Sequence, residues 1–261
     1  MLTVTMTPNL LGIRVAGDYD DLDKLYDAVS TLDDLDWEED ERIPEVEVCI
    51  RERLLALNYD LRHAYQGDRN VELVANGMNA ELAAWSGHED VKSYQNVVYS
   101  VEILYPEAMF ELICLNWLIE RRHAKLLGKK SVPPSEAMNS KVLLDEPCAR
   151  VRLYQSLVME AVRKRVPSNS FSRIHSQVCD HYVMVGRMYP QWLDVINGDW
   201  MGMTAQQRAK GMSTCVRDIA SYWRNPEYDE VKAGIDEFMR GRGAPLANVS
   251  LNVDYPDVYE W

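Results

Sequence analysis

The chain has 261 residues and a formal net charge of −13, with 47% hydrophobic and 26% charged residues. This composition excludes a disordered chain, and the length allows one large domain or two small ones. Residues 18–47 hold 14 acidic side chains against Lys24 and Arg42. A negative field of this kind repels phosphate backbones, so we expect no nucleic-acid partner.

The cysteines and the N-terminal sequence indicate a cytoplasmic protein. Five cysteines lie far apart and form no Cys-x-x-Cys motif, which favours reduced thiols. The first cation is Arg14, so no basic region precedes an apolar stretch and we expect no signal peptide. The longest apolar run, residues 108–119, contains Glu111 and Asn116. It is too short to span a bilayer and predicts a buried helix, so we expect no membrane partner.

The first half of the chain mixes strands and helices. Alternating residues predict a strand over 10–16, and helical spacing predicts a helix that Asp20 or Asp21 caps and that reaches residue 32. The acidic stretch 33–42 predicts a loop. The remaining predicted elements are helices over 44–66 and 106–127 and strands over 71–75 and 97–104, with a short segment without a clear pattern between the two strands.

The second half is predicted to be helical. Residues 129–140 contain two adjacent prolines and predict a linker. Helices are expected over 146–165, 170–188, 204–223 and 226–241, the third starting with a capping box at Thr204 and Gln207.

These elements predict a helix-dominated α+β fold. A small sheet with helices forms the N-terminal half and a helical bundle forms the C-terminal half. The expected division is an α+β domain over 1–128, a linker over 129–140, a helical bundle over 141–243 and a docked C-terminal tail over 244–261.

The C-terminal tail is expected to dock onto a protein surface because it holds eight large apolar side chains. Docking onto its own domain is favoured over docking onto a second copy.

No motif in the sequence indicates a metal or cofactor site. The run from Gly128 to Ser131 follows a helix instead of a strand, so it is no phosphate-binding loop. His175, Cys179 and His181 share one predicted helix and are interpreted as core residues. Acid-x-x-His pairs occur at Asp60/His63 and Glu120/His123, about as often as chance allows. We therefore expect no metal and no cofactor.

Polar side chains gather where the helix over 44–66 ends. The candidate catalytic residues there are Arg62, His63, Tyr65, Asp68 and Arg69. Such residue types can transfer protons, and loops often carry function. Two interpretations stay open: a polar network that fixes the join between helix and strand, which we favour, and an enzyme site.

Three groups of residues carry a family resemblance. They are Thr7-Pro-Asn9 with Gly17-Asp-Tyr19 and Asp21-Leu22, then Arg62 to Asp68, then Tyr105-Pro-Glu107 before an apolar helix. They resemble an uncharacterised bacterial domain family of unknown function, over roughly the first 130 residues. The resemblance implies a bacterial source and no activity.

The function is thus unknown from sequence, and two hypotheses remain. The first is a non-enzymatic cytoplasmic interaction or regulatory protein that contacts a protein partner or forms a homo-oligomer, with the acidic region 33–47 as a candidate contact surface. The second is an enzyme centred on the five polar residues after the long helix.

Overall fold

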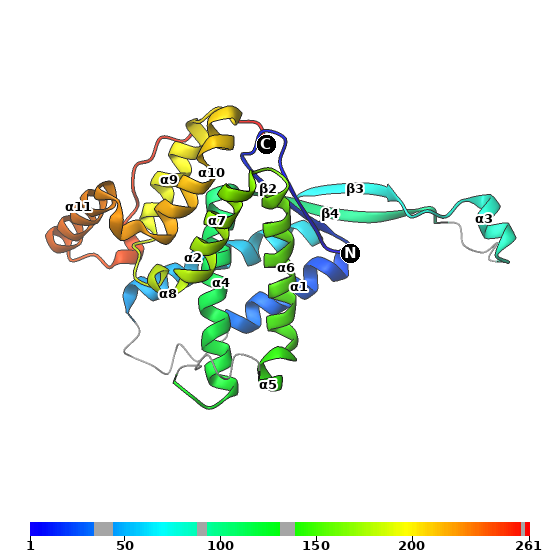
Figure 1. Cartoon of the computed structure of the whole chain (residues 1–261), viewed down its shortest axis with the longest axis horizontal. Helices are drawn as coiled ribbons and strands as arrows, with labels where there is room; N and C mark the ends of the chain where they lie inside the picture. The colour runs from blue at the N-terminus through cyan, green and yellow to red at the C-terminus, as the bar shows by residue number, and fades with distance from the viewer. Residues whose placement is uncertain (34–43, 88–92, 131–138, 257–258) are drawn as a thin grey trace.

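A computed structural model of the chain describes residues 1–33, 44–87, 93–130, 139–256 and 259–261. It confirms the helix-dominated α+β fold, in which helices gather around one antiparallel sheet (Figure 1). The sheet has the order β1-β2-β4-β3. Its strands are β1 (Thr3–Met6), β2 (Gly12–Gly17), β3 (Asn70–Ala75) and β4 (Gln95–Leu104).

Helices make up most of the remaining described chain. In the first half they are α1 (Tyr19–Asp33), α2 (Glu45–Tyr65), α3 (Ala80–Trp85) and α4 (Tyr105–Leu126). In the second half they are α5 (Ser140–Leu143), α6 (Glu146–Arg163), α7 (Ser168–Asp180), α8 (Tyr182–Val185), α9 (Gln191–Gly202), α10 (Ala205–Ala220) and α11 (Pro226–Arg242), with short 3-10 helices η2 (Tyr222–Arg224) and η3 (Leu246–Asn248).

The structure differs from the predicted elements in several places. Strand β1 and helices α3, α5 and α9 are additions. The helix expected over 170–188 is divided into α7 and α8, because His181 leaves the helical conformation (φ −117°, ψ 9°) and places its ring against Trp223. The expected loop 33–42 lies outside the described residues except for Asp33, which ends α1, and residues 131–138 of the expected linker lie outside them too.

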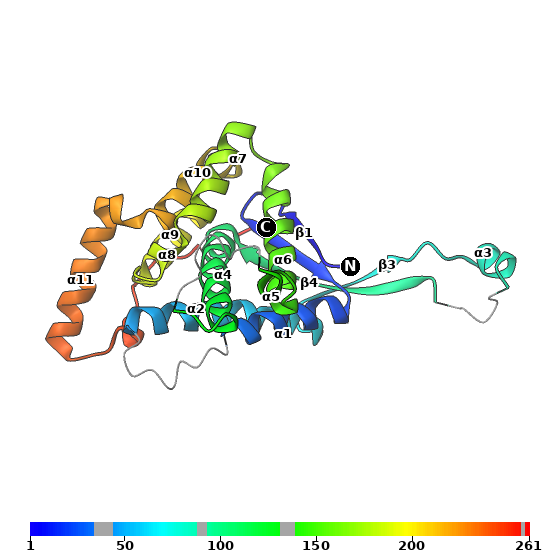
Figure 2. The ribbon, with the colours of Figure 1, turned by 60° about the horizontal axis from the view of Figure 1, so that its bottom comes forward.

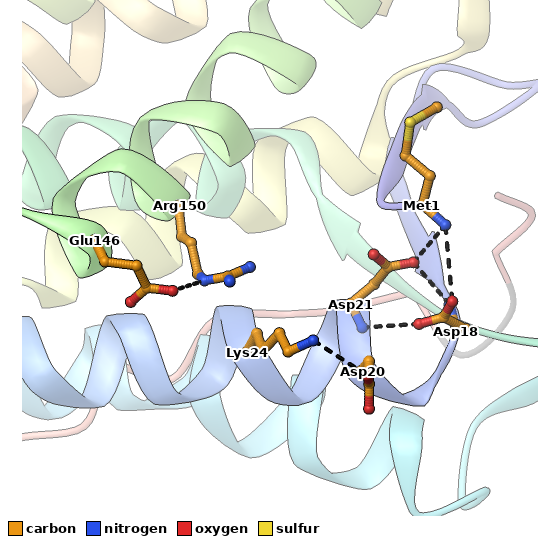
Figure 3. Close-up of polar contacts among 7 residues, drawn as sticks. All are labelled: Met1, Asp18, Asp20, Asp21, Lys24, Glu146 and Arg150. Atoms are coloured by element: carbon orange, nitrogen blue, oxygen red, sulfur yellow. Dashed lines mark hydrogen bonds and ion pairs between the residues drawn. The ribbon is translucent and has the colours of Figure 1, made fainter. Parts of the chain in front are cut away.

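The start of α1 is capped by Asp18 and not by Asp20 or Asp21 (Figure 3). The Asp18 carboxylate accepts a hydrogen bond of 2.9 Å from the backbone N–H of Asp21, and Asp21 accepts one of 3.1 Å from Asp18 in return. The amino group of Met1 lies 2.6 Å from Asp21. The acidic cluster is therefore a helix start that satisfies its free N–H groups and suits the helix dipole.

Helix α4 lies at the centre of the molecule. Nearly every residue from Tyr105 to Ile119 is buried, and helices from both halves of the chain contact it. The main core contains side chains on both sides of residues 129–140, from Leu2 to Tyr228. The two halves thus bury one shared core, and the predicted boundary between them remains a prediction.

The described part of the C-terminal tail lies on the chain's own surface. Leu246 and Val249 are buried, and the side-chain amide of Gln191 donates to both of their carbonyl groups at 3.0 and 3.1 Å. The carbonyl of Trp261 accepts a hydrogen bond of 3.2 Å from the N–H of Asn9. These contacts hold the tail against the β1–β2 loop and against α9.

Helix α10 offers a test of the packing. Met212 is buried against α4, so Met212→Ala leaves a cavity and is expected to cost about 2–5 kcal/mol in the free energy of unfolding. Urea denaturation measures this loss. The exposed neighbour Lys210 serves as the control, since Lys210→Ala should change stability by less than about 0.5 kcal/mol. Equal midpoints for the two variants would contradict a core position for Met212.

Candidate functional site

The turn after α2 pairs its polar side chains locally. The Nδ1 atom of His63 lies 3.0 Å from a carboxylate oxygen of Asp68. Arg69 donates a hydrogen bond of 3.0 Å to Asp60, which lies in the last two turns of α2. Both pairs join the end of the helix to the chain that leads into β3, so they fix the geometry of this join.

The other two predicted site residues point elsewhere. Tyr65 packs edge-on against Tyr19 and Tyr26, with ring centroids 5.2 and 6.1 Å away. Arg62 lies over the ring of Tyr59 and lines a cavity of about 320 Å³ between α1 and α2. Among the five predicted residues only Arg62 lines this cavity. The contacts account for a structural network, and a catalytic role for the five stays a prediction.

A long arm projects from the body of the molecule. Strands β3 and β4 run outward as a two-stranded ribbon, and α3 lies at its far end (Figures 1 and 2). All six residues of β3 are exposed. Strand β3 is also an edge of the sheet, since β4 is its only neighbour among the described strands.

One face of this arm is apolar although nothing in the described chain covers it. The register places Val71 opposite Tyr99 and Leu73 opposite Val97. Paired residues share a face, and this face continues inward to the buried side chains of Val101 and Ile103. Leu73 is 64% exposed and Trp85, in α3, is 85% exposed. The core face of the sheet therefore extends well beyond the helices that cover its base.

Charged side chains meet between α2, α4 and α9. Arg53 pairs with Asp194 and lies 3.4 Å from Glu107, which also accepts a hydrogen bond of 2.6 Å from Asn197. Burial raises the pKa of Glu107 although the positive charge of Arg53 opposes the shift. Burial also raises the pKa of Asp194. The cluster joins the two halves of the chain through one arginine.

Glu111 lies deeper, one helical turn after Glu107. It is buried, and its described hydrogen-bond partner is the hydroxyl of Tyr154 at 3.3 Å. Burial, reinforced by the nearby carboxylates of Glu107 and Asp60, holds the pKa of Glu111 well above its usual value. This environment favours the protonated form of the acid.

The cysteines and histidines form no metal site within the described residues, where no group of three or more His, Cys, Asp or Glu side chains could hold an ion. The Cys179 sulfur lies 3.9 Å from both ring nitrogens of His175. Burial raises the pKa of the Cys179 thiol, so this thiol is not activated as a nucleophile.

The described helices include none with the length and apolar character that crossing a membrane requires.

A family model described as a domain of unknown function (DUF6904) matches residues 2–261. The chain belongs to this family. No curated protein and no solved structure matches the chain. The match confirms the resemblance seen in the sequence and extends it over the helical second half, which the motifs had left uncovered. The family's description states no activity.

The motifs behind the resemblance hold the DUF6904 fold together across its two halves. The Thr7 hydroxyl accepts a hydrogen bond of 2.9 Å from Gly12 and closes the β1–β2 loop. From the second half, Arg208 donates to the carbonyl of Asn9 at 3.1 Å and Trp200 donates to that of Leu11 at 2.9 Å. Tyr105 stacks on Trp200, with centroids 5.0 Å apart. Thr7 closes the loop, and Asn9 and Tyr105 of these motifs join the two halves of the chain.

Sequence reasoning missed the arm and the charged cluster. Both strands of the arm were predicted, but alternation does not say which part of a strand a helix covers. Seven large apolar or aromatic side chains of the described arm are exposed, and the sequence pattern does not reveal their exposure: Val71, Leu73, Val74, Leu82, Trp85, Tyr94 and Val97. The charged cluster leaves no signal either, since Arg53 and Asp194 are separated by 141 positions.

Glu111→Gln is expected to stabilise the protein at neutral pH. In the folded state Glu111 keeps its proton at pH values above its ordinary pKa of 4.5. In the unfolded chain the same carboxyl loses its proton at these pH values. Stability therefore falls as pH rises above about 4.5, and glutamine removes this loss. We expect a gain of about 1–3 kcal/mol near pH 8 that vanishes near pH 4.

Urea denaturation across this pH range measures the effect. The exposed Glu52→Gln variant is the control and should stay within about 0.5 kcal/mol of the parent. A Glu111→Gln variant that is less stable than the parent at pH 8 would show that the carboxylate is ionised and needed.

The thiols are expected to react in two classes. The five cysteines are all free, and four are buried while Cys179 is exposed. A thiol-specific reagent should therefore modify one cysteine rapidly in the native protein and all five after denaturation without reductant. Cys179→Ser should abolish the rapid phase. Fewer than five reactive thiols in the denatured protein would indicate a disulfide.

Proposed function

We propose that this protein is a non-enzymatic cytoplasmic interaction protein and that the arm formed by β3, α3 and β4 is its docking element. The observation that carries the proposal is the uncovered apolar face of the arm. Free cysteines support the cytoplasmic setting.

The exposed apolar surface of the arm favours binding to another molecule. A two-stranded ribbon is marginally stable by itself in water. Here the ribbon exposes Val71, Leu73 and Val97 on one face and carries Leu82 and Trp85 at its tip. Removing these side chains from water would contribute roughly 25 cal/mol per Å² of apolar surface. Exposed apolar surface gathered in one place marks an interaction site more often than apolar residues scattered singly.

The favoured occupant is a second copy of the chain. The arm offers an open strand edge along β3, an apolar face and an apolar tip, which are the parts that strand addition uses. Two arms can stack face to face across a twofold axis, so that each apolar face covers the other with identical contacts. A single chain thus supplies both sides of the interface.

The enzyme alternative has weaker support. His63, Asp68 and Arg69 already have partners near the turn, and Tyr65 lies among aromatic rings. Among the five, Arg62 lines the cavity between α1 and α2 and the other four do not. The enzyme alternative stays a prediction, and a structural change at this turn on addition of a substrate would support it.

The oligomeric state tests the proposal. At about 100 μM, above the Kd of an interface of ordinary size, light scattering should give twice the chain mass. The double variant Leu73→Ser/Trp85→Ser should give the chain mass, with an unchanged circular dichroism spectrum, because both side chains are exposed. A parent protein that is monomeric at this concentration would refute pairing of two copies.

A matched control and a cross-link make the test specific. Leu144 is 82% exposed but lies between α5 and α6, so Leu144→Ser should leave the dimer intact. In a Cys179→Ser background, Leu73→Cys should form a disulfide-linked dimer on oxidation, whereas Leu144→Cys should not. Equal cross-linking at both positions would show random collision.

A further inference from the structure

A groove of about 400 Å³ opens between α4, α6 and α7. Its walls are largely apolar, with Leu112, Met159, Phe171 and Val178 among them. Arg152 lines the same groove. This combination of an apolar wall with a few polar groups is typical of sites for small molecules, and the volume lies within their usual range.

Arg152 carries a charge that no described carboxylate neutralises. Its Nη1 atom donates to the side-chain oxygens of Asn116 and Gln155, which are both neutral amides. None of the ion pairs in the described chain includes Arg152, and burial lowers its pKa. Arg53 and Arg122, by contrast, each have a carboxylate partner. Arg152 is an exposed residue, so water solvates part of its charge, and a bound anion would supply the ion pair that the described chain does not.

Arg208 shows what a purely structural arginine looks like in this protein. It also lacks a carboxylate among the described residues, but its three nitrogens Nε, Nη1 and Nη2 all donate to backbone carbonyls at 3.0–3.1 Å. Arg152 uses only Nη1 within the described chain. Its remaining N–H donors, on Nε and Nη2, include the two with which one edge of the guanidinium can bind both oxygens of a carboxylate.

The other ionisable groups near the groove do not supply the missing charge. Glu160 lines the groove, but its two carboxylate oxygens accept from Arg163 at 2.8 and 2.7 Å. Burial raises the pKa of the Cys148 thiol to about 12 and raises that of Cys179 as well, so both thiols are neutral at pH 7. The groove therefore keeps a positive charge in a chain whose net charge is −13.

We infer that this groove binds a small organic acid, with its carboxylate on Arg152 and its apolar part against Leu112, Phe171 and Val178. The inference is independent of the arm and adds a ligand site to the proposed interaction protein. A carboxylate fits the paired donors of the guanidinium, and the wall excludes a fully hydrated ion such as phosphate as the preferred ligand.

Calorimetric titration with phenylacetate and hexanoate, against 2-phenylethanol and inorganic phosphate, tests the inference. The acids should bind with a Kd in the range of about 0.1–1 mM, and the neutral alcohol should bind at least tenfold more weakly. Arg152→Met should weaken the acids about tenfold or more. Arg150→Met, two positions along α6 at a side chain paired with Glu146, should leave binding unchanged.

A second measurement locates the ligand. With methionine methyl groups labelled by ¹³C, phenylacetate should shift the resonance of Met159, in the groove, and leave that of Met212, in the core, unmoved. Three results would each overturn the inference: no binding of either acid at about 10 mM, equal binding of acid and alcohol, or tighter binding of phosphate than of the acids. Unchanged binding of the acids by the Arg152→Met variant would also overturn the inference.

Discussion

The arrangement of helices depends on one helix that is buried almost all the way round and still carries polar side chains. Helix α4 brings Glu107, Glu111 and Asn116 into the core, where each needs a hydrogen-bond partner. Asn197 of α9 binds Glu107, Tyr154 of α6 binds Glu111, and the Asn116 amide binds a carbonyl of α7. Apolar packing alone tolerates sliding and rotation, but these bonds do not. They set the position of three helices from the second half around a helix from the first.

This dependence explains what the sequence could and could not predict. Helix spacing is local, so the ends of α2, α4 and α6 lie within a few residues of their predicted ends. The apolar run over 108–119 correctly indicated a buried helix. Which helices surround it depends on contacts between distant positions, such as Arg53 with Asp194, and periodicity contains no such information. Local rules also failed at His181, where a side-chain contact with Trp223 accompanies the break in a helix.

The candidate site shows the same limit at the level of side chains. The sequence correctly indicated a dense polar group after α2, because residue types and turn position are visible in it. It could not tell that His63 would pair with Asp68 while Tyr65 turned toward Tyr19. The exposed face of the arm could not be predicted from the sequence for a related reason. Alternation predicts a strand with one apolar face, but a covered strand and an uncovered one have the same alternation.

The arm and the groove each hold a group that lacks a complement in the described chain. Apolar strand faces at the base of the sheet are covered by helices, whereas the same face on the arm is open. Half-buried arginines such as Arg53 and Arg122 have carboxylate partners, and Arg208 has three carbonyls, whereas Arg152 has two neutral amides bound to one nitrogen. The arm therefore presents an apolar face that no described helix covers, and the groove presents an arginine that no described carboxylate pairs with. Such local exceptions in a consistent fold are where binding is expected, because the missing complement can come from a partner or a ligand.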